Sequence, residues 1–219
     1  MNTSSMSIEE LLFESGLRIN NSLSDAKILN AVTPMGYPET KLNEGAALLD
    51  EATTLVETQK REYGELDAAQ AVFETERLAA NTNYINTVRI SRIAFKNDVK
   101  ATSTLELNGR RARTISGWLK QTLGFYRALL SNDEWKAALA VYGQTEEILN
   151  ARLAAIESVA AASEAVKKEK GDAQNATQER DMKLEELVDW VNDYEVIARI
   201  ALADRPQLLE KLGIVVKSK

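Results

Sequence analysis

The chain has 219 residues, of which 44% are apolar and 27% charged, and its 27 lysines and arginines against 33 aspartates and glutamates give a formal net charge of −6. This acidic balance argues against general nucleic-acid binding, which needs a basic surface, and against docking on anionic lipid. Cysteine and histidine are both absent, which excludes disulfides, thiolate metal sites and any mechanism that uses a histidine base.

The N-terminal stretch MNTSSMSIEELLFESG has neither the basic start nor the apolar centre of a signal peptide. No later run of apolar residues reaches the length that spans a bilayer. A cytoplasmic location is therefore the default expectation. A short helix is predicted at about 7–22, and TPMGYP at 33–38 is predicted to be a loop, because Pro38 followed by Glu39 suits a helix start.

Apolar residues then recur three or four positions apart along both halves of the chain, which is the helical period and not the alternation of a strand. No Asn-Gly or Asp-Gly hairpin signal separates β-branched runs. The sequence therefore predicts an all-α protein. Examples of the apolar stripe are Leu48, Leu55, Leu66, Phe73, Val88, Leu149, Ile156, Leu184, Val191 and Ile197.

The two halves of the chain resemble each other at an offset of 107 residues. Identical pairs include Gly36 and Gly143, Glu39 and Glu146, Arg92 and Arg199, and Ile93 and Ile200. We expect one domain, 1–219, built from two tandem repeats, 1–108 and 109–215. The alternative is two unrelated helical stretches of similar composition. The offset exceeds the period of solenoid repeats, about 20–50 residues, and suits a duplicated helical module.

The stretches KREYGE and KKEKGD place Gly64 and Gly171 at equivalent positions of the two halves. Basic residues before a glycine and an acid after it are typical of a helix end followed by a new helix. On this interpretation the two glycines are the tips of helical hairpins, and the fold is a four-helix up-and-down bundle with an internal pseudo-twofold axis. Its helices would span about 39–63, 66–104, 133–170 and 173–203, with short extra helices at 7–22 and 112–130.

The alternative has no hairpin tips. Two very long antiparallel helices, each about 100 Å at 1.5 Å per residue, would pass one another, as in a coiled coil. A glycine inside a helix costs only about 1 kcal/mol, so Gly64 and Gly171 are compatible with this arrangement too.

Other breaks in the helical pattern are few. Asn132 or Asp133 can cap a helix that follows. The residues LNGRR at 107–111 separate the halves, and Pro206 ends a helix before a last turn that stops at Gly213.

Nothing in the sequence forms a catalytic constellation. There is no glycine-rich phosphate loop, and paired glutamates such as Glu146 and Glu147 are best explained as a solvated helix face. We therefore expect no enzyme activity, no cofactor and no metal. Arg92 and Arg199 lie in apolar runs at equivalent positions; they are either bundle-edge arginines whose heads pair with carboxylates or a symmetric anion clamp.

A possible partner surface lies in the second half. It comprises Arg110, Arg111, Arg113, Trp118, Trp135 and Tyr142. The three arginines are the densest basic patch and could dock an acidic partner, or they could be a charged linker and helix start. The aromatic residues could fill the core or contribute to a partner surface, where tryptophan, tyrosine and arginine are enriched.

The segment IARIALADRPQLLEKLGI at 197–214 resembles one that recurs in uncharacterised bacterial all-helical proteins. The resemblance implies a bacterial source and a helical fold, and it brings no activity or site residue.

These observations favour a non-enzymatic helical interaction or scaffold module, with a protein partner or a second copy of the chain, over two alternatives. One is a long-helix protein that enters membranes, which the acids within AALLDEATTLV disfavour. The other is an enzyme with an unusual carboxylate or lysine site. Nucleic acid is not an expected partner, and a membrane is an unlikely one on this sequence.

Overall fold

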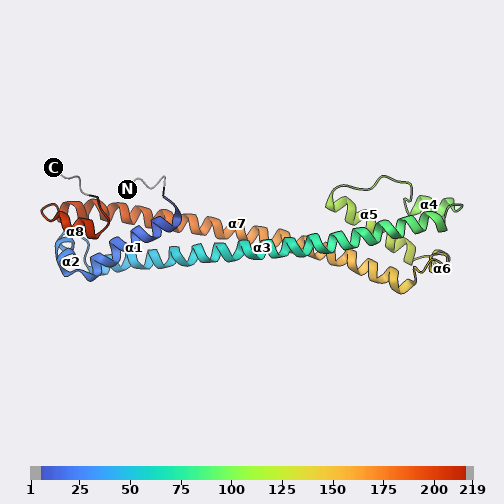
Figure 1. Ribbon diagram of the computed structural model, residues 1–219, viewed down its shortest axis with the longest axis horizontal. Helices are drawn as coiled ribbons and strands as arrows, with labels where there is room; N and C mark the ends of the chain where they lie inside the picture. The colour runs from blue at the N-terminus through green and yellow to red at the C-terminus, as the bar shows by residue number, and fades with distance from the viewer. Residues whose placement is uncertain (1–5, 216–219) are drawn as a thin grey trace. The chain divides into compact units, whose positions relative to one another are not determined.

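The computed structural model describes residues 6–215, and this part of the chain holds helices and no strand, which confirms the expected all-α class. Figure 1 shows the order of the elements. They are α1 (Ile8–Ser24), α2 (Ala26–Val32), the 3-10 turn η2 (Thr33–Met35), α3 (Glu39–Ala94), α4 (Val99–Thr104), α5 (Ile115–Leu130), α6 (Asp133–Ala140), α7 (Glu146–Ala201) and α8 (Pro206–Lys211). Of these helices, none combines the length and apolarity that crossing a membrane requires.

The hairpin interpretation is wrong, because Gly64 lies inside α3 and Gly171 inside α7, and each of these helices is continuous over its full length of 56 residues. Neither glycine has a positive φ, so neither adopts the left-handed conformation that would close a helix. Strong helix formers flank both, and few turn residues follow them. The helix propensity of the flanking residues therefore outweighs the modest cost of one glycine in each helix. The alternative interpretation, with two very long helices, describes α3 and α7 better than the hairpin interpretation does.

Two of the expected helices are also interrupted: 66–104 is divided at 95–98 between α3 and α4, and 133–170 is divided by the turn at 141–145 between α6 and α7. Gly143 has φ +74° there, as its counterpart Gly36 has φ +91° at the corresponding turn before α3. The left-handed glycines that punctuate the chain are thus this pair and Gly213. The predicted cap at Asn132 is confirmed, since its side chain accepts a hydrogen bond from the amide of Trp135 at 3.0 Å.

The chain divides into two compact units, each of which takes one part from either half of the sequence. Unit 1 joins the residues up to Tyr63 with those from Asp172 onward, and unit 2 comprises Gly64–Gly171. Unit 1 therefore holds α1, α2, η2, the start of α3, the end of α7, and α8. Unit 2 holds the end of α3, α4, α5, α6 and the start of α7.

Within each unit α3 and α7 run antiparallel. In unit 1 the Lys183 ammonium binds the Glu51 carboxylate at 3.0 Å, and the Thr177 hydroxyl lies 3.5 Å from that of Tyr63. As the residue number increases along α3, the number of its contact residue in α7 therefore decreases. Shorter helices pack beside this pair and complete each unit (Figure 1).

Each unit has its own hydrophobic core. In unit 1 the residues at its centre include Ile19, Ile28, Leu42, Leu187 and Tyr194. The corresponding cluster of unit 2 includes Tyr84, Tyr126, Leu129, Leu139 and Ile156. One close contact of unit 1 requires a glycine: a Cβ on Gly45 would lie 2.5 Å from the indole ring of Trp190.

The helices of the second half begin 107 positions after their counterparts. The matching first residues are Ile8 and Ile115, Ala26 and Asp133, Glu39 and Glu146, and Val99 and Pro206. The backbone follows the same offset, because the left-handed residues Glu106 and Gly213 are also 107 apart. Counterparts such as α1 and α5 lie in different units, so the two units hold equivalent elements with different side chains.

Candidate functional site

The residues that the sequence singled out are divided between the units. Arg199 belongs to unit 1 and Arg92 to unit 2. The predicted partner surface lies wholly in unit 2. Of that set, the side chains of Trp118 and Trp135 are buried in the core.

The two tryptophans are held by hydrogen bonds as well as by packing. The indole of Trp118 donates to the Asn81 side chain at 2.9 Å, and that of Trp135 donates to the Asp98 carboxylate at 3.3 Å. Buried indole groups usually find such partners. The exposed members of the predicted surface are Arg110, Arg113 and Tyr142, so the structure does not bring the whole set together on one face.

Arg111 points inward and fastens the segment between α4 and α5. Its guanidinium donates to the Tyr84 hydroxyl at 2.6 Å and to the carbonyls of Glu106 and Leu107 at 2.9 and 3.1 Å. It also lies 5.6 Å from the centroid of the Tyr84 ring. Burial raises the pKa of Tyr84, and the nearby Arg111 guanidinium partly opposes that rise, so the hydroxyl stays neutral and accepts the hydrogen bond.

Arg92 fastens the same segment from α3. Its Nε and Nη2 donate to the Leu107 carbonyl at 2.8 and 2.6 Å. In unit 1 the equivalent Arg199 pairs with the Glu195 carboxylate at 2.7 Å and reaches the Val215 carbonyl at 3.4 Å. Each arginine thus ties its long helix to the segment that follows the next short helix, which gives both a structural role.

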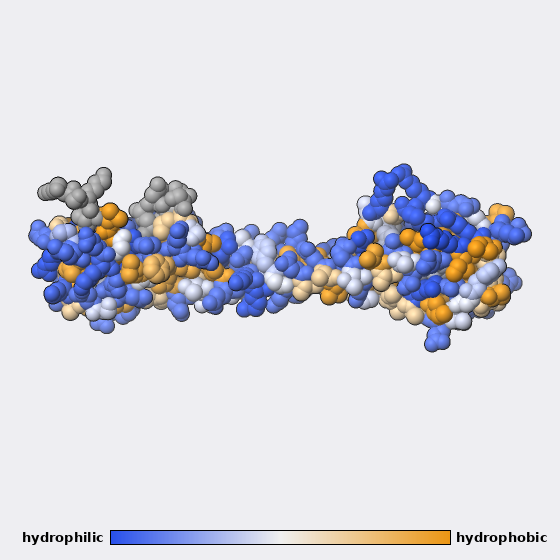
Figure 2. All heavy atoms as spheres, viewed as in Figure 1, coloured by the Kyte–Doolittle hydropathy of each residue, from blue (hydrophilic) through white to orange (hydrophobic). Residues whose placement is uncertain are grey.

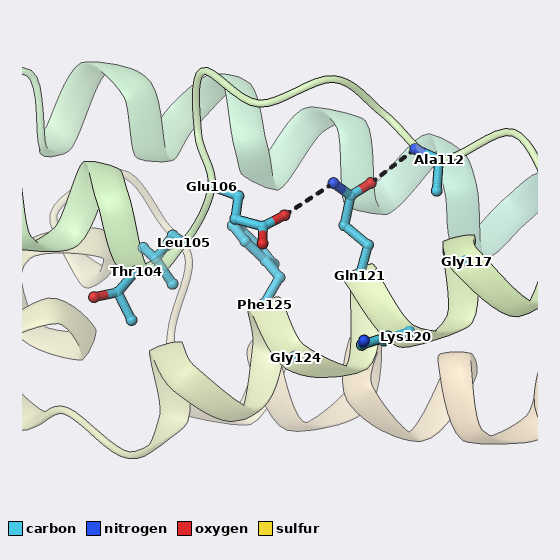
Figure 3. A pocket seen from close by; sticks show the side chains of 9 residues that line it. All are labelled: Thr104, Leu105, Glu106, Ala112, Gly117, Lys120, Gln121, Gly124 and Phe125. Carbon is cyan, nitrogen blue, oxygen red and sulfur yellow. Dashed lines mark hydrogen bonds between the residues drawn. The ribbon is translucent and has the colours of Figure 1, made fainter.

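A cleft of about 450 Å³ lies between this segment and α5, and Figure 3 shows its lining. The residues that line it are Thr104, Leu105, Glu106, Ala112, Gly117, Lys120, Gln121, Gly124 and Phe125. The segment is held over the cleft by Gln121, whose side-chain oxygen accepts from the Ala112 amide at 3.1 Å and whose amide group donates to the Glu106 carboxylate at 3.3 Å. In Figure 3 the side chains of Glu106 and Gln121 point toward one another.

The lining combines opposite charges with an apolar wall. Leu105 and Phe125 are buried at 2% and 3% exposure, whereas Glu106 and Lys120 are exposed to solvent. Among residues 6–215 no ion pair joins Glu106 and Lys120, and neither has an ion-pair partner elsewhere. The cleft therefore presents a carboxylate and an ammonium group that do not neutralise each other directly.

The equivalent positions of unit 1 are filled differently. Leu17, the counterpart of Gly124, packs so closely on Gly213, the counterpart of Glu106, that a Cβ at 213 would come 2.9 Å from Leu17 Cδ2. In unit 2 the bulky residue and the small one have changed places. A Cβ on Gly124 would meet no atom within 4 Å, so neither close packing nor a positive φ requires glycine there.

Glycine at position 124 and glutamate at position 106 each have an energetic cost in unit 2. Glycine within a helix destabilises it by about 0.5–1 kcal/mol relative to alanine, and Gly124 lies in the interior of α5. Glu106 has φ +50°, a left-handed conformation that costs a residue with a side chain about 1–2 kcal/mol. The cleft is thus lined by two residues that are unfavourable for the fold alone, which is a feature of functional sites.

Sequence reasoning missed the residues of this cleft, Glu106, Lys120, Gln121 and Gly124. One available signal was the mismatch at equivalent positions, Leu17 against Gly124 and Gly213 against Glu106. Comparison of the chain with models of protein families, with curated proteins and with solved structures found no match to any of them.

Proposed function

We propose that the protein is a non-enzymatic interaction or scaffold module that binds a protein partner through both units. The observation that carries the proposal is an exposed isoleucine at the same position of each half. Ile93 near the end of α3 is 60% exposed, and Ile200 near the end of α7 is 58% exposed. They belong to different units.

An isoleucine that faces solvent contributes little to a core, so packing does not account for its presence in both halves. The surrounding Arg-Ile-Ala triplets are identical at 92–94 and 199–201. In unit 1 the apolar surface extends by one helical turn, because Val196 precedes Ile200 by four residues and is 59% exposed. Hydrophobic side chains also reach the surface of unit 2 on the face drawn in Figure 2. Contiguous exposed apolar surface marks interaction sites, and arginine is enriched at binding hot spots.

The proposal includes a tandem duplication as the origin of the two halves. The recurrence of helix starts and of left-handed residues at an offset of 107 supports it. A partner with two equivalent binding segments, or two copies of one partner, would then engage each unit through the same exposed position.

Site-specific crosslinking tests the proposal. A photoreactive amino acid placed at position 93 or 200 is expected to crosslink to the same partner in cells that naturally carry the chain. The matched control places it at Thr82 or Asp189, which are exposed and also 107 apart. Crosslinks at 93 and 200 that do not exceed those at the control positions would overturn the proposal, and crosslinks to a second copy of the chain would identify self-association as the interaction.

A further inference from the structure

The cleft between α5 and the segment that follows α4 has the features of a small-ligand site. Its volume of about 450 Å³ lies within the range of ligand pockets, about 300–1,000 Å³. All of its lining residues belong to unit 2. The space beside α5 exists because Gly124 has no side chain where unit 1 has Leu17.

The charges of the lining restrict what would bind. Glu106 offers a carboxylate from the segment above the cleft, and Lys120 offers an ammonium group from α5, one helical turn before Gly124. A ligand with a single charge would satisfy one group only. A ligand with one positive and one negative group would satisfy both, with charge-assisted hydrogen bonds at each end.

The wall of the cleft adds an apolar requirement. Phe125 and Leu105 belong to the wall but are almost fully buried, so the surface open to a ligand is that over Gly124, where unit 1 holds the apolar side chain of Leu17. Gln121 already uses its side chain to hold Glu106 and the backbone of the segment, so it fixes the orientation of the carboxylate. A molecule of the right chemistry is small and zwitterionic, with an apolar side group.

We propose that this cleft binds a free α-amino acid with an apolar side chain. The ammonium group of the ligand donates to the Glu106 carboxylate, its carboxylate accepts from Lys120, and its side chain lies over Gly124, at the position that Leu17 fills in unit 1. Binding makes and breaks no covalent bond. This inference stands on unit 2 alone and does not rest on the partner surface around Ile93 and Ile200.

The left-handed conformation of Glu106 supports the assignment. The equivalent residue in unit 1 is a glycine, which adopts this conformation without strain. A glutamate at the same backbone position is unfavourable for the fold and places a carboxylate at the edge of the cleft.

The test is titration calorimetry of the full chain with L-leucine and L-phenylalanine, and with N-acetyl-L-leucine and L-leucinamide, which lack one of the two charges. We expect the free amino acids to bind and the two derivatives to bind at least about tenfold more weakly, because each loses one charge-assisted hydrogen bond. The derivatives also distinguish a free amino acid from a residue within a peptide.

Variants locate the binding within the cleft. Gly124→Leu restores the side chain that unit 1 has and is expected to abolish binding, whereas Gly64→Leu makes the same change at an open helical position and is expected to leave it unchanged. Glu106→Gly, which copies unit 1 and relieves the backbone, and Lys120→Gln are expected to weaken binding by about tenfold. Circular dichroism confirms that each variant folds.

Three outcomes would overturn the proposal. The first is that neither amino acid binds at millimolar concentration. The second is that the derivatives bind as tightly as the free amino acids. The third is that the folded Gly124→Leu variant binds as the wild type does.

Discussion

Replacing Arg18 with phenylalanine and Glu195 with valine together is expected to leave unit 1 about as stable as the wild type, whereas either replacement alone is expected to destabilise it. Both side chains are buried, at 5% and 9% exposure. Unit 2 has Phe125 and Val88 at the equivalent positions, and both of these are buried too. One unit thus holds an opposite-charge pair where the other holds two apolar residues of similar size.

The geometry of the charged pair sets the magnitude. Arg18 Nε lies 3.7 Å from Glu195 Oε2, and neither atom makes a hydrogen bond to any described residue. Removing one partner of a buried ion pair costs about 3–5 kcal/mol when the other charge is left alone. Here the remaining charge has a second ion-pair partner in each single variant: Arg18 still pairs with Glu14 at 2.9 Å, and Glu195 still pairs with Arg199 at 2.7 Å. We therefore expect each single replacement to lower the free energy of unfolding by about 2–3 kcal/mol.

The double replacement removes both charges and fills the space with apolar groups, which is often neutral or stabilising. We expect it to lie within about 1 kcal/mol of the wild type, which implies a coupling energy of at least about 3 kcal/mol. Native-state hydrogen exchange of α1 measures the stability of unit 1, and α5 in unit 2 serves as an internal reference. A double variant as destabilised as the sum of the two single variants would refute the reasoning.

Three further predictions concern glycine packing, pH and the repeats. Gly45→Ala is expected to destabilise the protein by about 1–3 kcal/mol in urea denaturation, because the new Cβ would press on the indole ring of Trp190. Gly64→Ala, whose Cβ would meet no atom within 4 Å, is expected to stabilise the protein by about 0.5–1 kcal/mol. Equal effects of the two substitutions on stability would contradict this prediction. The hydrogen bond from the Lys211 side chain lowers the pKa of Asp25 from 3.8, so the ionised Asp25 stabilises the protein above that pH, and this stabilisation is lost as the pH falls below it. Asp25→Asn, which keeps a capping acceptor, is expected to have a lower thermal midpoint than the wild type at neutral pH and a similar one in acid. A difference in thermal midpoint that does not depend on pH would argue against the linkage. A fragment of residues 1–108 is expected to dimerise in sedimentation equilibrium, because within the full chain the second half of α3 packs with residues beyond 108; a folded monomer would count against the duplication.

The helical period was sufficient to predict the fold class, because a stripe of apolar residues three or four apart is incompatible with a strand. Capping residues were readable for the same reason: Asn132 needs only its own side chain and the next turn to act as a cap. Both signals are local in sequence. The start of α3 at Glu39 was predicted from Pro38, whereas the start of α7 at Glu146 was not, because the expected helix 133–170 ran through it.

The turns were harder to place, because a glycine in the sequence does not reveal its own backbone conformation. The basic residues around Gly64 and Gly171 favoured a helix end, and both glycines are helical. Gly143 had weaker flanking signals and is left-handed. Its alignment with Gly36, which lies between Pro34 and Pro38, was the better guide.

The cleft was out of reach for a different reason. Glu106 and Gly124 are far enough apart in the chain that their proximity depends on how α5 folds back under the preceding segment. The sequence shows that the two halves differ at these positions, and it does not show that the two differences adjoin. Only the assembled unit brings them together.

The division of each half between the two units has a consequence for how the protein can change. In a symmetric homodimer a substitution alters both binding surfaces at once, so neither can be lost or modified alone. Here a substitution at one position of the chain alters one unit only. The structure contains two versions of the same helical arrangement, one closed by the side chain of Leu17 and one open at Gly124. A single chain can therefore keep one version for stability while the other takes on a ligand.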